Sequence, residues 1–207
     1  MGYTSPMLRE RIGIFGGTFD PPHIGHLILA TEACVKLRFD RLLWVLTPTP
    51  PHKLTQSITA LEHRLEMLKL AISHEPTFEI SRIEIDRPGP HYTVDTMRLL
   101  ADEYPSAELI LLIGGDSLRD LPTWHQPTKL VSACHEIGVI RRPNDSVDLS
   151  AWERQVPGTQ AKVRFVDAPL LDIASRDIRR RVRENLSFRY FLPPSVYDYI
   201  LKNELYR

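Results

Sequence analysis

Two histidines, His23 and His26, stand three residues apart in a segment rich in glycine and proline, Gly16 to His26. The segment follows the apolar run Ile12 to Phe15, which predicts a buried strand, and precedes Leu27 to Lys36, which predicts a helix. Glycines let backbone amides approach a ligand closely, and a helix start carries a partial positive charge. With two imidazoles as donors, this junction is suited to binding a polyphosphate.

A zinc pair and ordinary helix capping are the alternative explanations of His23 and His26. Zinc normally needs a third protein ligand, and the stretch supplies no Cys or Glu at a familiar metal spacing. Capping alone does not explain why glycines, prolines and histidines occur together here. The segment also lacks the Gly-Lys-Ser/Thr end of a Walker loop and the G-x-G-x-x-G spacing of the dinucleotide fingerprint. These features favour an anion-binding loop of another type.

A second group of polar residues follows the predicted strand Arg41 to Leu46. The segment Thr47 to Lys53 is rich in proline, so it presents His52 and Lys53 with little conformational entropy left to lose on binding. A solvated loop with an incidental lysine explains the same residues equally well.

Two further candidate segments follow the predicted strands Phe78 to Ile85 and Glu108 to Ile113. Thr93 opens a predicted helix, whose free amides could hold a carboxylate or simply be capped. Asp116 stands where acidic residues bind ribose hydroxyls, although a helix cap explains it as well. Trp124 could stack on a flat ring or belong to the core.

The last candidate pair is Ser175 and Arg179, one helical turn apart at the start of a predicted helix, Ser175 to Glu184. We expect Ser175 to cap this helix and both residues to address the same anion, because the planar guanidinium suits phosphate oxygens. A basic solvated helix is the alternative, since further arginines follow.

The elements that must position these residues alternate regularly along the chain. The predicted strands are fully apolar and separated by helices, which indicates a parallel sheet covered on both faces. They are Ile12 to Phe15, Arg41 to Leu46, Phe78 to Ile85, Glu108 to Ile113, Ile137 to Ile140 and Val163 to Val166. We therefore predict a doubly wound α/β fold, in which ligands bind beyond the carboxyl ends of the strands.

Local signals add detail to this scheme. Thr59 to Glu62 reads as a capping box, and Ser195 as the cap of a helix that ends near Leu205. The polar stretch Pro143 to Gly158 predicts a surface excursion that contains Trp152, whereas Trp44 is predicted in the core.

The composition excludes several classes of protein. The 207 residues suffice for one compact domain, and 26 Lys and Arg balance 26 Asp and Glu, so no basic field favours nucleic acid. Cys34 and Cys134 belong to no paired motif and are predicted to be free thiols. Without a signal core or a long apolar run, we predict a cytoplasmic protein with no membrane partner. The sequence is compatible with a monomer and with a homo-oligomer.

The segment Gly16 to His26 resembles the HxGH signature of the adenylyl- and cytidylyltransferase superfamily, and its full form resembles that of bacterial nicotinate-nucleotide adenylyltransferases. The resemblance extends over most of the chain. It implies a Rossmann-like domain over residues 9–207, with 170–207 as a small helical subdomain and 1–8 as an N-terminal extension.

The resemblance also implies roles for individual residues. Catalysis would depend on His23, His26, Lys53 and Arg179. ATP would be bound by Gly16, Gly17, Thr18, Phe19, His23, His26, Asp116, Ser175 and Arg179. Nicotinate mononucleotide would be bound by His52, Lys53, Tyr92, Thr93 and Trp124. The chain departs from the family pattern at His91, Ala174 and Arg176, which replace hydroxyl residues.

The implied reaction is in-line attack of the phosphate of nicotinate mononucleotide on the α-phosphorus of ATP, which gives nicotinate adenine dinucleotide and pyrophosphate. Because the attacking phosphate is already ionised, no general base is required, and positioning with charge neutralisation suffices. Mg²⁺ is expected mainly on the ATP phosphates, with no dedicated protein ligand. Alternatives are adenylyl transfer to nicotinamide mononucleotide or phosphopantetheine, or an inactive nucleotide-binding regulator.

Overall fold

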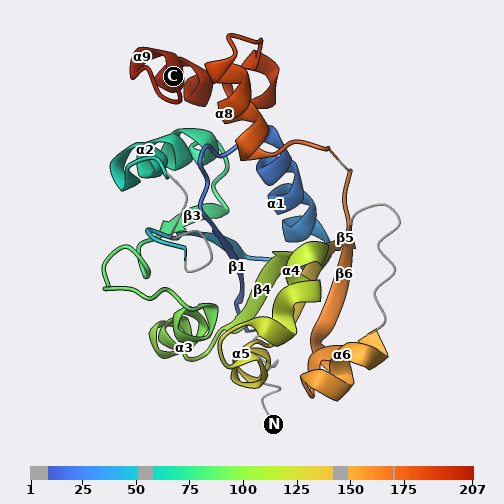
Figure 1. Ribbon diagram of the computed structural model, residues 1–207. Coiled ribbons are helices and arrows are strands. Elements are labelled where there is room, and N and C mark those ends of the chain that lie inside the picture. The colour runs from blue at the N-terminus through green and yellow to red at the C-terminus, as the bar shows by residue number, and fades with distance from the viewer. Residues whose placement is uncertain (1–8, 51–57, 142–148, 170) are drawn as a thin grey trace.

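The computed structural model describes residues 9–50, 58–141, 149–169 and 171–207. Within these ranges, six parallel strands form a sheet in the order β3-β2-β1-β4-β5-β6, with helices on both faces (Figure 1). The strands are β1 (Arg11–Gly17), β2 (Arg41–Leu46), β3 (Phe78–Ser81), β4 (Glu108–Gly114), β5 (Glu136–Arg141) and β6 (Val163–Asp167). The predicted doubly wound parallel fold is confirmed.

The helices connect these strands and cover the sheet. They are α1 (Ile24–Leu37), α2 (Leu61–Ile72), α3 (Thr93–Glu103), α4 (Gly115–Asp120), α5 (Pro127–Ala133), α6 (Leu149–Gln155), α7 (Thr159–Lys162), α8 (Ser175–Arg183) and α9 (Pro194–Lys202). Two short 3-10 helices, η2 (Leu121–Thr123) and η3 (Arg189–Phe191), complete the described elements. None of the helices within the described residues is long and apolar enough to cross a membrane.

Alternate residues of the central strands enter two hydrophobic clusters, one on each face of the sheet. Ile12 and Ile14 of β1 join the cluster that includes Met97 of α3, whereas Phe15 joins the cluster that includes Ala33 of α1. A strand buried on both faces has no polar side, which explains why these strands read as continuous apolar runs.

Two glycines inside strands allow the α1 side of the sheet to pack closely. A Cβ added at Gly13 would lie 2.5 Å from the ring of Phe39, and one at Gly138 would lie 2.5 Å from the side chain of Leu37. Both neighbours belong to the end of α1 and the turn after it. The absent side chains therefore let this helix end settle against the sheet.

The predicted C-terminal helices are present and pack on α2 at one end of the sheet (Figure 1). A third hydrophobic cluster joins Met67 of α2 to Ile178 of α8 and to Val196 and Ile200 of α9. Figure 1 shows α8 beside the start of α1, so this cluster holds the C-terminal helices next to the segment that contains His23.

The predicted caps of α2 and α9 are wrong. Helix α2 begins at Leu61 without a side-chain cap, and the backbone amide of Thr59 donates instead to Asp20 at 3.2 Å. Helix α9 begins at Pro194, and the Ser195 hydroxyl donates to the carbonyl oxygen of Leu70 at 3.2 Å. In both places a tertiary partner replaces the local one.

Two predicted element lengths are also corrected. Strand β3 ends at Ser81 rather than at Ile85, and a turn follows. The excursion predicted over residues 143–158 contains helix α6, and residues 142–148 lie outside the described part. Trp152 of α6 packs partly against the core and donates from Nε1 to the carbonyl oxygen of Leu118 at 2.6 Å. Helix α6 has only 7 residues, too few to show a clear apolar periodicity in the sequence.

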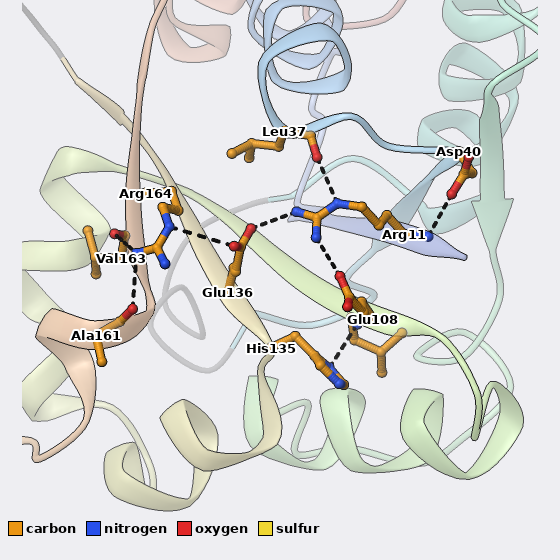
Figure 2. Close-up of polar contacts among 10 residues, drawn as sticks. Arg11, Leu37, Asp40, Glu108, His135, Glu136, Ala161, Val163 and Arg164 are labelled. Atoms are coloured by element: carbon orange, nitrogen blue, oxygen red, sulfur yellow. Dashed lines mark hydrogen bonds and ion pairs between the residues drawn. The ribbon is translucent and has the colours of Figure 1, made fainter. Parts of the chain in front are cut away.

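The amino-terminal edge of the sheet carries linked charges (Figure 2). Arg11 of β1 donates to Glu108 of β4, to Glu136 of β5 at 2.7 Å and to the carbonyl oxygen of Leu37 at 3.0 Å. Arg164 of β6 lies 3.6 Å from Glu136. These contacts join the starts of four neighbouring strands, at the edge opposite the loop that contains His23.

The two cysteines are free, as predicted. Burial raises the pKa of Cys34 to about 11 and that of Cys134 to about 12. Neither thiol is therefore ionised near neutral pH, so both behave as packing residues.

Candidate active site

A cavity of about 690 Å³ lies at the carboxyl ends of β1 and β4. These neighbouring strands flank the point where the strand order reverses, which is where ligands bind in open α/β sheets. Besides apolar residues, the wall contains Gly16, Gly17, Thr18, Thr47, Pro50, Glu84, His91, Tyr92, Thr93, Thr96, Ser117, Asp120, Thr123, Trp124 and His125. The predicted residues Gly16 to Thr18, Tyr92, Thr93 and Trp124 thus share one cavity.

The turn after β1 needs glycine because of Phe19. Phe19 adopts a left-handed backbone conformation with φ of 45°, and its ring folds back over the loop. A Cβ added at Gly17 would lie 2.8 Å from that ring. Gly16 has open space around it, so a ligand can approach its backbone.

The two signature histidines stack on one another at the start of α1. Their ring centroids are 3.7 Å apart and the planes are inclined by 25°. His23 is the N-cap residue and is only 6% exposed. Burial lowers the pKa of His23 to about 4, so this imidazole is neutral at physiological pH.

The hydrogen bonding of His26 fixes which ring nitrogen carries its proton. The backbone amide of His23 donates to Nδ1 of His26 at 3.2 Å. A neutral imidazole that accepts at Nδ1 is protonated at Nε2. The ring also lies edge-on to Phe15, a residue of the cavity wall, with centroids 6.1 Å apart. His26 therefore offers an Nε2–H donor beside the cavity.

Asp20 joins the signature loop to distant segments. Its carboxylate is buried, at 4% exposure, and accepts a hydrogen bond of 2.8 Å from the Tyr206 hydroxyl besides the bond from Thr59. Arg179 donates to the carbonyl oxygen of Asp20 at 2.6 Å, and its guanidinium lies 3.9 Å from the carboxylate. The motif identified Asp20, but no local signal pointed to Thr59 or Tyr206 as its partners.

Ser175 and Arg179 both reach the signature loop from α8. The predicted cap is wrong, because the N-cap residue is Ala174 and Ser175 is the first residue of the helix. The Ser175 hydroxyl donates instead to the carbonyl oxygen of Pro21 at 2.8 Å. The side chains of Arg176 and Arg180 are exposed, so the solvated basic face also exists.

The far part of the cavity wall is aromatic. Helix α3 begins at Thr93, as predicted, with Tyr92 as its N-cap residue. The Tyr92 ring stacks on His125, with centroids 4.1 Å apart and planes inclined by 23°. Trp124 is half-buried, packs partly against the core and lines the cavity. This wall offers flat surfaces and free helix amides close together.

Two wall residues that the sequence reasoning did not assign are Glu84 and His91. Glu84 is 5% exposed and accepts a 2.6 Å hydrogen bond from the Thr96 hydroxyl. Burial lowers the pKa of His91, which lines the same cavity. Glu84 lies in a turn, whereas the sequence predicts a strand there. Its place on the cavity wall could therefore not be predicted from the sequence.

The remaining predicted residues lie at the margins. Asp116 is exposed in the first turn of α4 and lies 3.2 Å from Arg119, while Ser117 and Asp120 line the cavity. His52 and Lys53 lie outside the described residues.

Comparison with known proteins agrees with this architecture. The cytidylyltransferase-like family model matches residues 14–181. A probable nicotinate-nucleotide adenylyltransferase of Thermomicrobium roseum is 48% identical over 198 residues, which cover 96% of this chain and 92% of the relative. The nicotinate-nucleotide adenylyltransferase of Bacillus subtilis is 38% identical over 197 residues, 95% of this chain and 98% of the relative.

Solved structures show the same fold. That of Plasmodium falciparum nicotinic acid mononucleotide adenylyltransferase complexed with NaAD matches with a TM-score of 0.79 and 21% identity, over 96% of this chain and 98% of that one. Its complex with APC matches with a TM-score of 0.76 at the same identity and coverage. The chain belongs to the cytidylyltransferase-like family and, within it, to the nicotinate-nucleotide adenylyltransferases.

Proposed function

We propose that the protein transfers the adenylyl group of ATP to nicotinate mononucleotide. The observation that carries this proposal is the single cavity whose wall includes both the loop after β1 and the aromatic surface around Trp124. Adenylyl transfer requires two nucleotides to meet, and this cavity extends from phosphate-binding glycines to a surface suited to a flat ring.

On the donor side, the loop Gly16 to Phe19 binds the phosphates of ATP through backbone amides. Burial keeps His23 neutral, and Nδ1 of His26 accepts a hydrogen bond, so both residues are assigned as hydrogen-bond donors rather than as cations. Positive charge comes from Arg179 and from Lys53. Asp116 binds the ribose of ATP, and Ser175 keeps α8 on the loop.

On the acceptor side, the amide of Thr93 at the start of α3 binds the nicotinate carboxylate. Trp124 stacks on the pyridine ring, and Tyr92 orients the helix start as its N-cap. His52 and Lys53 bind the phosphate of the mononucleotide and bring it toward ATP.

The reaction needs no nucleophilic side chain. An oxygen of the acceptor phosphate forms a bond to the α-phosphorus of ATP, and the bond from that phosphorus to the bridging oxygen of the β-phosphate breaks. The bonding electron pair leaves with pyrophosphate, so no proton has to be removed from the nucleophile. Donors around the α-phosphate stabilise the charge that develops in the transition state.

Mg²⁺ fits this site as part of the ATP complex. Across residues 9–50, 58–141, 149–169 and 171–207, no three His, Cys, Asp or Glu side chains gather as a metal site. Phosphate oxygens and water would hold the ion, since Mg²⁺ commonly retains several waters. When bound, it neutralises charge on the phosphates of ATP.

Pyrophosphate release tests the proposal directly. The protein is supplied with ATP, Mg²⁺ and one acceptor at a time: nicotinate mononucleotide, nicotinamide mononucleotide or phosphopantetheine. We expect the highest kcat/KM with nicotinate mononucleotide. Preferred turnover of another acceptor would replace the substrate assignment, and ATP binding without pyrophosphate release from any acceptor would indicate a regulator.

A further inference from the structure

Arg64 of α2 is a charged side chain with almost no contact with solvent. Only 2% of its surface is exposed, and its guanidinium donates four hydrogen bonds. The acceptors are the carbonyl oxygens of Thr59 at 2.8 Å, Thr18 at 3.0 Å, Thr47 at 2.9 Å and Pro48 at 2.8 Å. All four are backbone groups, so the guanidinium holds the path of the main chain.

The acceptors of Arg64 belong to the two loops between which the substrates must meet. Thr18 follows β1 and Thr47 follows β2, and both line the cavity. A single nitrogen of Arg64, Nη1, donates to both of these carbonyl oxygens. A backbone bond of 3.0 Å from Thr47 to Gly17 lies alongside. The guanidinium thus fixes the spacing between the loop after β1, which is proposed to bind ATP, and the loop after β2, which is proposed to bind the acceptor nucleotide.

Only a guanidinium can make this set of contacts. Its planar fork presents five N–H donors in fixed directions, whereas the ammonium of lysine is a point charge on a flexible stem. Burying a charge is costly unless hydrogen bonds compensate for the lost water, and here the four carbonyl oxygens do so. An apolar side chain would fill the same volume without ordering either loop.

The contact with Thr18 also sets the orientation of a peptide group in the signature loop. In a planar trans peptide, the carbonyl oxygen and the following N–H point in opposite directions. Because the carbonyl oxygen of Thr18 points to Arg64, the amide of Phe19 points away from it. The amide is therefore held in one direction before any ligand arrives.

We propose that Arg64 is a positioning residue for the transfer, which sets the distance between ATP and the acceptor nucleotide without contacting either. The inference rests on the proposed function, because it assigns the loops after β1 and β2 to the two substrates. It goes beyond that function by separating the binding of each substrate from their mutual alignment.

This role predicts a particular kinetic effect. Reacting atoms must approach to about 3–3.5 Å, and a misplacement of about 1 Å can cost about 100-fold in rate. We expect Arg64→Lys to lower kcat about 100-fold while each KM changes by less than about 5-fold, since either nucleotide still finds its own loop.

Arg11 provides the matched control, because it too is an arginine with several partners that joins separate segments, at the opposite edge of the sheet. Arg64→Lys, Arg64→Ala and Arg11→Lys are assayed well below their melting temperatures. We expect lower Tm in all three variants but lower kcat only in the Arg64 variants. Added guanidinium ion at millimolar concentration should restore part of the kcat of Arg64→Ala and leave Arg11→Lys unchanged.

Four results would overturn the role of Arg64. They are unchanged kcat in folded Arg64→Lys, a loss matched by Arg11→Lys, a rise confined to one KM, or unfolding of both Arg64 variants at 15 °C while Arg11→Lys stays folded. The wild type assayed in parallel separates this role from the proposed function. If it prefers another acceptor, the substrate assignment fails and Arg64 is tested with that acceptor. If it turns over none, both fall.

Discussion

The hydroxyl of Ser175 donates a hydrogen bond of 2.8 Å to the carbonyl oxygen of Pro21, across 154 residues of sequence. One turn further along α8, Arg179 bonds to the carbonyl oxygen of Asp20 at 2.6 Å. Both bonds end on the loop between β1 and α1. The C-terminal helices are thereby attached to the segment that is proposed to bind ATP.

Replacing Ser175 tests this attachment. We expect Ser175→Ala to lower the free energy of unfolding by about 1 kcal/mol, as typical for one hydrogen bond, and to raise the KM for ATP. Ser195→Ala is the control, because Ser195 also donates to a carbonyl oxygen but does so away from the loop. Urea unfolding and initial rates check both effects. Equal KM values for ATP in the two variants would show that the attachment does not serve binding.

The protonation of His26 gives a prediction about side-chain geometry. Asparagine resembles Nδ1 of histidine in position, whereas glutamine reaches the position of Nε2. We expect His26→Asn to lower kcat about 100- to 1000-fold, the usual cost of a lost transition-state donor, and His26→Gln to retain more activity. His74→Asn, at an exposed position, is the control. Full turnover by His26→Asn would contradict the donor role.

Burial of His23 makes stability depend on pH. The pKa of His23 is lowered from 6.5 to about 4, so the unfolded state binds more protons between these values. The contribution of neutral His23 to the free energy of unfolding is therefore fully present above pH 6.5. As the pH falls to 4, the free energy of unfolding decreases by about 3 kcal/mol. In His23→Asn this component should be missing. Urea unfolding of both proteins from pH 7 to pH 4 checks it, and parallel pH profiles would contradict the assignment.

Trp124 should affect the acceptor more than ATP. Ring stacking contributes about 0.5–1.5 kcal/mol, so we expect Trp124→Ala to raise the KM for nicotinate mononucleotide about 3- to 10-fold. Trp124→Phe should lose less. Trp152→Phe removes the bond to Leu118 and should lower only the melting temperature. An increase in the KM for ATP alone would move Trp124 to the donor side.

The charged edge in Figure 2 should matter for stability and not for turnover. Removing Arg11 leaves Glu108 and Glu136 close together without the cation between them. Because these groups are partly exposed, we expect Arg11→Met to cost about 1–2 kcal/mol. Thermal unfolding measures the loss, and kcat at a temperature where the variant is folded should equal that of the wild type. Reduced kcat there would link this edge to the site.

The sheet could be predicted from the sequence because strands that are buried on both faces appear in it as continuous apolar runs. Runs such as Glu108 to Ile113 contain apolar residues without alternation, which is typical of a strand covered on both faces. The parallel arrangement then gathers the loops at one edge. This explains why Gly16 to Thr18, Thr93 and Trp124 line one cavity although they are far apart in the sequence.

Hydrogen bonds between residues far apart in the sequence could not be predicted, because no local pattern indicates the partner. A serine at a helix start has the same local chemistry whether it caps its own helix or, as Ser175 does, bonds to Pro21. Arg64 stands within a predicted helix, and nothing nearby in the sequence shows that four carbonyl oxygens surround its guanidinium. Tyr206 likewise carries no signal that points to Asp20.

The bond between Tyr206 and Asp20 has a consequence for the growing polypeptide. Asp20 leaves the ribosome 186 residues before its partner, which corresponds to roughly 10–40 s at ordinary rates of translation. During that interval the nascent chain already contains the loop after β1 and Thr59, whose amide donates to the Asp20 carboxylate, but not the hydroxyl of Tyr206 that donates to its other oxygen. The hydrogen bond that joins the loop after β1 to the C-terminal segment can therefore form only late in synthesis.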